Sequence, residues 1–118
     1  MIASIAAVSA AIAIGFSAFG AHGAANPQAA EWLRTGGLYQ LIHAVAVVAV
    51  ALSPGSGQGT LNGPAAILLG GSALFAATLY AMAFGAPRWL GAITPIGGVL
   101  MILGWLWLAW RFVGSRLS

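Results

Sequence analysis

Three polar side chains with different chemistry lie close together in the sequence: Tyr39, Gln40 and His43. Residues three and four positions apart share one side of a helix, so Gln40 and Tyr39 would each neighbour His43 there. In apolar surroundings a phenol, an amide or an imidazole without a hydrogen-bond partner costs about 1–3 kcal/mol. We therefore expect an interhelical hydrogen-bond network at this place or, alternatively, a binding site for a lipid head group, a quinone or an ion.

The two histidines, His22 and His43, are candidate ligands for a metal or a haem. Two imidazoles on neighbouring helices are enough for a bis-histidine haem, but a zinc site needs further ligands. The chain has no cysteine, and its single acid, Glu31, has Arg34 three residues later as an expected ion-pair partner. No serine, histidine and acid stand at a recognisable catalytic spacing. We therefore expect no catalytic residue, no metal and no cofactor, and a protein that is not an enzyme.

Fixed charges are rare in this chain: 4% of its 118 residues are charged, compared with about a quarter in a typical soluble domain. The net charge of +3 comes from single, scattered arginines rather than from a basic stripe, so nucleic acid is not an expected partner. A proton-coupled exporter would need an ionisable side chain within a span, whereas the sole acid falls at the membrane edge. The charged residues are Glu31, Arg34, Arg88, Arg111 and Arg116.

Long apolar stretches between these charges predict an all-α fold, an integral membrane four-helix bundle with short connections. It forms a single transmembrane domain over residues 1–118, with spans at about 2–19, 36–52, 64–84 and 92–112. Asn26-Pro27 predicts a turn after the first span, with the second helix beginning between Glu31 and Gly37. The segment from Ser53 to Gly59 has the composition of a flexible linker.

The start of the last span has two interpretations. Thr94-Pro95 is either an N-cap followed by a proline at the first helical position, or a kink inside a longer helix. We favour the N-cap, which makes residues 89–93 a short interfacial or re-entrant piece.

The N-terminal apolar segment is expected to be a retained span rather than a signal peptide, because no arginine or lysine precedes Arg34. Four spans place both termini on one side of the membrane. The two sides carry two arginines each, so the positive-inside rule decides little, and we take the termini to be cytoplasmic.

On this topology the polar side chains gather at one end of the bundle, opposite the uncharged linker. This candidate polar cluster comprises His22, Glu31, Arg34, Tyr39, Gln40, His43, Tyr80, Arg88 and Thr94. Helix packing in lipid depends on close backbone approach, which small residues allow. The predicted packing positions are Gly15, Gly70, Ala73, Ala77, Gly97 and Gly104.

Several of these residues stand in longer motifs, namely Phe19-Gly20-Ala21-His22-Gly23, Tyr39-Gln40 with His43-Ala44, Leu79-Tyr80, and Leu90-Gly91-Ala92-Ile93-Thr94-Pro95-Ile96-Gly97-Gly98. From about Gly15 to Trp105 the chain resembles the domain-of-unknown-function 423 family of YgdD-like small membrane proteins. The resemblance implies a bacterial inner-membrane protein with four spans and no established activity. It also leads us to expect a Ser-Gly-Ser-type run before Leu79, where this chain has Ala76-Ala77-Thr78 and so keeps one hydroxyl.

The expected function is that of a non-enzymatic accessory or assembly subunit, which binds membrane partners or lipids through its helix faces. Its expected partners are membrane lipids and either another membrane protein or a second copy of the chain. The alternatives are a small transporter or channel, or a protein that binds a quinone or lipid head group, in each case through the polar cluster. The expected location is the bacterial inner (plasma) membrane, which the chain crosses several times.

Overall fold

The computed structural model of the chain describes residues 1–53 and 61–117, with side chains as far as Gly114. These residues form four long helices and one short 3-10 segment: α1 (Ile2–His22), α2 (Pro27–Ala51), α3 (Asn62–Ala83), η2 (Arg88–Ala92) and α4 (Thr94–Leu117). Four segments, one for each long helix, are long and apolar enough to cross a membrane. The predicted all-α, four-span fold is therefore confirmed. Apart from Ser53, the predicted linker lies outside the described residues.

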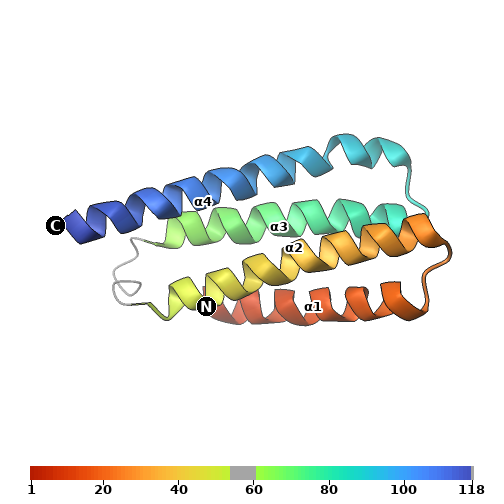
Figure 1. Cartoon of the computed structure of the whole chain (residues 1–118), viewed down its shortest axis with the longest axis horizontal. Helices are drawn as coiled ribbons and strands as arrows, with labels where there is room; N and C mark the ends of the chain where they lie inside the picture. Colours follow the sequence, from red (N-terminus) through yellow and green to blue (C-terminus); the bar gives the residue numbers. More distant parts are fainter. Residues whose placement is uncertain (54–60, 118) are drawn as a thin grey trace.

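The helices lie side by side in chain order (Figure 1). Extended interfaces join α1 to α2, α2 to α3 and α3 to α4, whereas α1 and α4 share no such interface among the described residues. Both termini lie at one end of the molecule, and the connections α1–α2 and α3–η2 lie at the other (Figure 1). The terminal helix α1 therefore rests mainly on a single neighbour.

Glycines allow consecutive helices to approach closely. A Cβ atom on Gly36 of α2 would lie 2.8 Å from the ring of Tyr80 on α3. On Gly97 of α4 it would lie 2.6 Å from the Phe75 nitrogen, and on Gly104 it would lie 2.8 Å from a methyl carbon of Leu68. Two of the predicted packing positions, Gly97 and Gly104, thus lie inside the α3–α4 interface.

The other four predicted packing residues lie outside the interfaces of this chain. Gly15 and Gly70 have open space where a side chain would be, and Ala73 and Ala77 are exposed. On α3 the buried side is shifted by about one residue, since Gly71, Ser72 and Ala76 are the buried members of the neighbouring stripe. The prediction of packing within the chain is corrected for these four positions.

Helix α2 begins earlier than predicted, at Pro27 rather than between Glu31 and Gly37. The Oδ1 atom of Asn26 accepts a hydrogen bond from the backbone N–H of Ala29 at 2.8 Å, and Pro27 occupies the first turn. Asn-Pro therefore acts as an N-cap with a proline in the first turn, instead of a connecting turn. As a consequence, residues 39–43 lie in the middle of α2 and not in its first turns.

A glycine in the left-handed region ends α3. Gly85 has a φ of +103°, and its N–H donates to the carbonyl of Met82 at 3.1 Å. The next N–H, from Ala86, donates to the carbonyl of Ala81 at 2.9 Å, and the two bonds together form a Schellman motif. After this turn the chain continues into η2.

The short piece before the last span is present as η2, and α4 begins separately at Thr94. The Thr94 hydroxyl does not cap the helix. It donates to the Leu90 carbonyl at 3.3 Å and lies 2.7 Å from the hydroxyl of Thr78. Of the two interpretations of Thr94-Pro95, the separate piece is the correct one, although Thr94 is the first helical residue and not the cap.

Candidate functional site

Gln40 connects three helices through both ends of its amide group. Its Nε2 donates to the Oγ atom of Ser9 on α1 at 2.9 Å, and its Oε1 accepts from the hydroxyl of Tyr80 on α3 at 2.6 Å. The Gln40 residue is only 5% exposed, and the Phe16 ring stacks on the Tyr80 ring at a centroid distance of 4.1 Å. The predicted interhelical network is present here, although Tyr39 is not part of it.

His43 makes a second connection, from α2 to α4. Its Nδ1 lies 2.6 Å from the backbone carbonyl of Tyr39, and its Nε2 lies 2.9 Å from the indole N–H of Trp105. A carbonyl oxygen accepts hydrogen bonds and an indole N–H donates them, so Nδ1 carries the proton and Nε2 is the acceptor. Both ring nitrogens are therefore used within the chain, and neither offers a free lone pair to a metal or a haem.

The remaining predicted site residues lie elsewhere. Tyr39 is 42% exposed, and its ring packs against Phe75. Glu31 and Arg34 form an exposed ion pair at 3.0 Å, and His22 is exposed at the end of α1. Arg88 lies over the ring of Trp32, with its guanidinium carbon 5.6 Å from the ring centroid.

The nine predicted residues therefore do not form one cluster, and the prediction of one polar end is corrected. Gln40 bonds to Tyr80, His43 bonds to Trp105, and Thr94 lies against Thr78. His22, Glu31, Arg34 and Arg88 surround the end of the molecule that carries the α1–α2 and α3–η2 connections. Gln40 is thirteen residues beyond Pro27, about 20 Å along the helix axis, so its contacts lie well inside a hydrocarbon layer of about 30 Å. The prediction placed Gln40 and His43 near the end of the bundle because it began α2 too late in the sequence.

Sequence reasoning missed three participants in these contacts: Ser9, Phe16 and Trp105. Ser9 lies on the buried side of α1 with Ala6, Ala13 and Gly20. The other three are seven residues apart, and Ser9 stands three residues after Ala6 and four before Ala13, a spacing that marks one side of a helix. That regularity is a usable signal for Ser9. Trp105 has no comparable signal, because nothing in the sequence separates it from the other tryptophans.

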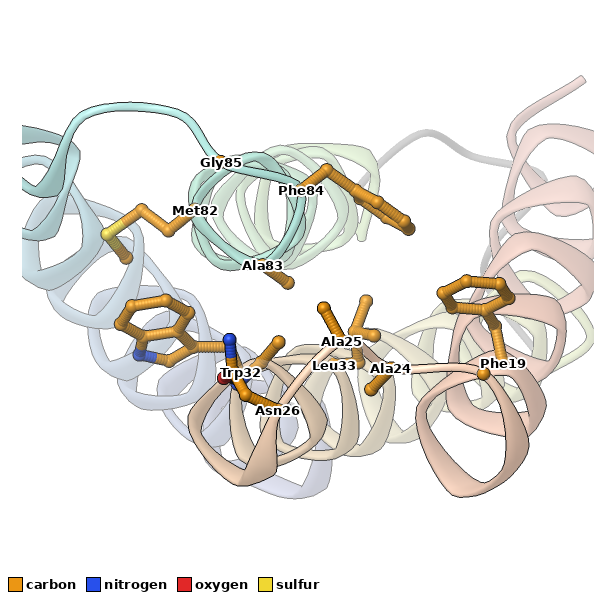
Figure 2. A pocket seen from close by; sticks show the side chains of 12 residues that line it. Phe19, Ala24, Ala25, Asn26, Trp32, Leu33, Met82, Ala83, Phe84 and Gly85 are labelled. Carbon is orange, nitrogen blue, oxygen red and sulfur yellow. Dashed lines mark hydrogen bonds between the residues drawn. The ribbon is translucent and has the colours of Figure 1, made fainter.

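Sequence reasoning also missed a pocket of about 380 Å³, which lies at the end formed by the two connections. Figure 2 shows the rings of Phe19 and Phe84 on one side and the indole of Trp32 on the other, with the α1–α2 connection below them. The centroids of the two phenyl rings are 5.4 Å apart. The residues that line the pocket are Phe19, Gly23, Ala24, Ala25, Asn26, Ala29, Trp32, Leu33, Met82, Ala83, Phe84 and Gly85.

Comparison with known proteins finds relatives that are described as membrane proteins. The chain is 39% identical over 105 residues to the UPF0382 membrane protein SSP2132 of Staphylococcus saprophyticus, with 86% of this chain and 88% of that protein covered. It is 38% identical over 116 residues to a UPF0382 membrane protein of Haemophilus influenzae, with 96% and 94% covered. A third relative, UPF0382 membrane protein C1782.12c of Schizosaccharomyces pombe, is 34% identical over 111 residues, with 86% and 92% covered.

No solved structure matches the chain. The sequence profile described as "Protein of unknown function (DUF423)" matches residues 16–98, a range that holds the pocket and the Gln40–Tyr80 pair. The match covers more than half of the chain and agrees with the family suggested by its motifs. This four-span membrane protein belongs to the DUF423 family.

Proposed function

We propose that this protein is a non-enzymatic accessory or assembly subunit of the bacterial plasma membrane, which binds other membrane proteins through its exposed helix faces. The observation that carries the proposal is the exposure of α1. Only 17% of the residues in the most apolar part of α1 are buried, compared with 50% in α3. A helix that rests mainly on one neighbour in its own chain has room for a further neighbour from another chain.

The exposed side of α1 is also suited to a second helix. Small residues follow one another along it at spacings of three and four, and all of them are exposed: Ser4, Ala7, Ala11, Gly15 and Ala18. Helices in lipid associate where small side chains allow their backbones to approach closely. The partner is either another membrane protein or a second copy of this chain, and lipids cover the remaining surface.

The inner polar groups favour this role over the transporter or channel alternative. Gln40, Tyr80 and Ser9 are hydrogen-bonded to one another, and His43 is bonded at both ring nitrogens. Side chains that satisfy each other in this way hold helices together and leave little polar surface for a passing ion or substrate.

The test is purification of tagged chain from its native membranes in mild detergent, followed by quantitative mass spectrometry. We expect a defined partner, or a second copy, at a fixed ratio with the wild type. Ala11→Trp should abolish this recovery because the indole blocks close approach to α1. Val99→Trp, on the exposed side of α4, is the matched control and should leave recovery unchanged. Recovery of the isolated chain alone would contradict the accessory role.

A further inference from the structure

The pocket near the α1–α2 connection has a lining that suits a hydrocarbon chain. Its lining consists mainly of aromatic and small apolar side chains, with Asn26 as the one polar side chain. The Oδ1 of Asn26 is already used as the helix cap of α2, at 2.8 Å from the Ala29 nitrogen. A volume of about 380 Å³ falls within the usual range of roughly 300–1,000 Å³ for small-ligand sites.

A positive charge stands beside this apolar space. The guanidinium of Arg88 lies 5.6 Å from the centroid of the Trp32 ring, which forms one wall of the pocket (Figure 2 shows this ring). No acid of this chain neutralises Arg88, because the only acidic side chain is Glu31, and it pairs with Arg34 at 3.0 Å. Arg88 is exposed and therefore accessible to a ligand from outside.

The depth of the pocket in the membrane also restricts the kind of ligand that it can bind. It lies where α1 and α3 end and α2 begins, which in a spanning protein is the depth of the lipid head groups. Tryptophan and arginine are common at this depth because each combines an apolar body with a polar tip. A ligand that is apolar at one end and anionic at the other would match both the lining of the pocket and Arg88.

We propose that this pocket binds one anionic phospholipid, with part of an acyl chain between Phe19, Phe84 and Trp32 and with the phosphate beside Arg88. An anionic lipid matches both the apolar walls and the unpaired charge, whereas a quinone would match only the walls. This site is separate from the exposed side of α1. The proposal goes beyond the accessory role and stands if that role fails.

The test compares lipids directly on the purified full-length chain in nanodiscs of phosphatidylcholine with a few per cent phosphatidylglycerol, using native mass spectrometry after gentle activation. Wild type should retain phosphatidylglycerol in preference to phosphatidylcholine. Arg88→Gln should lower that preference about fivefold, which corresponds to about 1 kcal/mol. Arg88→Lys keeps the charge and should keep most of the preference, and Arg34→Gln removes an arginine already paired with Glu31 and should keep it fully.

A second pair of variants tests the walls. Ala25→Trp fills the pocket and should reduce retention of phosphatidylglycerol, while Ala21→Trp changes an exposed residue outside the lining and should not. Far-ultraviolet circular dichroism checks that each variant is helical. Equal retention of the two lipids by wild type would overturn the proposal, and so would retention unaffected by both Arg88→Gln and Ala25→Trp. Retention of a neutral quinone or of inorganic phosphate in place of the lipid would also overturn it.

Discussion

Gln40 shows how a single side chain can hold three helices in register inside a membrane. The amide has a donor end and an acceptor end, and the structure uses one for α1 and the other for α3. Loss of one partner leaves a buried polar atom unpaired, which costs more than an apolar replacement of both partners. The same reasoning applies to His43, whose two ring nitrogens are bonded to a backbone carbonyl and to an indole.

We predict energetic coupling between Gln40 and Tyr80. Tyr80→Phe should lower the free energy of unfolding by about 1 kcal/mol, because it leaves the Oε1 of Gln40 unpaired and interhelical hydrogen bonds in membranes are worth about 0.6–2 kcal/mol. The double variant Gln40→Leu/Tyr80→Phe should cost less than the sum of the two single variants. Unfolding with sodium dodecyl sulfate, followed by circular dichroism, measures all three, and additive costs would refute the coupling.

The residues of the site were only partly predictable. The spacing of Gln40 and His43 placed them on one side of α2 and predicted a network between helices, which needs only local geometry. Their partners Ser9 and Trp105 come from distant parts of the chain, and the choice among many apolar helix faces depends on packing. The pocket was unpredictable for the same reason, since it is formed where two helix ends and a connection meet.

The helices themselves are defined by their ends and by the places where they approach one another. Composition was enough to predict four spans, because a lipid layer demands long apolar segments whatever their detailed packing. Prediction of where each helix begins and ends also requires its capping residues to be identified. With Asn26 as its cap, α2 begins about one turn before Glu31, the earliest start predicted from the apolar pattern alone. Gly85 ends α3 in a left-handed turn.

The N-cap of α2 can be tested with the two asparagines of the chain. Asn26→Ala should lower the free energy of unfolding by about 0.5–2 kcal/mol, because the Ala29 N–H loses its acceptor. Asn62→Ala is the matched control, since the first turn of α3 has no side-chain cap bond. It should change stability by less than about 0.5 kcal/mol. Equal effects of the two substitutions in thermal unfolding would show that Asn26 does not act as a cap.

The close approach of α3 and α4 predicts opposite outcomes at two adjacent glycines. Gly97→Ala should destabilise the protein by about 1–3 kcal/mol, because the added methyl would lie 2.6 Å from the Phe75 nitrogen and 2.7 Å from the Gly71 carbonyl oxygen. Gly98 has nothing within 4 Å of an added Cβ. Gly98→Ala should therefore be neutral or stabilising by up to about 1 kcal/mol, through its better helix propensity. Chemical unfolding in detergent micelles distinguishes them, and similar losses at both positions would contradict the interface.

The described part of the molecule is an open row of four long helices, and its two ends differ in character. One end carries the termini, and the other carries the pocket, Arg88 and the Glu31–Arg34 pair. The lack of cysteine makes the topology easy to test, because any cysteine introduced is the only thiol. Overall architecture was predictable to the level of four spans. The order of contacts between helices was not, because apolar faces of similar composition offer many pairings.

Asn26→Cys and Ser53→Cys place single thiols at the two opposite ends of α2. In intact cells, a membrane-impermeant maleimide should label one of these variants and leave the other unlabelled until the cells are opened. Cytoplasmic termini predict that the protected thiol is that of the Ser53→Cys variant, because residue 53 lies at the end that carries the termini. Labelling of both from outside would rule out an odd number of crossings between residues 26 and 53.

The neighbour-to-neighbour order of the helices also bears on how the protein is made. Among the described residues, every extended interface joins two helices that follow each other along the chain. Each of these extended interfaces can therefore form as soon as its second helix has left the ribosome and entered the bilayer. Assembly then proceeds in the direction of synthesis, and α4 completes the molecule by docking on α3, with one further hydrogen bond from Trp105 to His43 on α2.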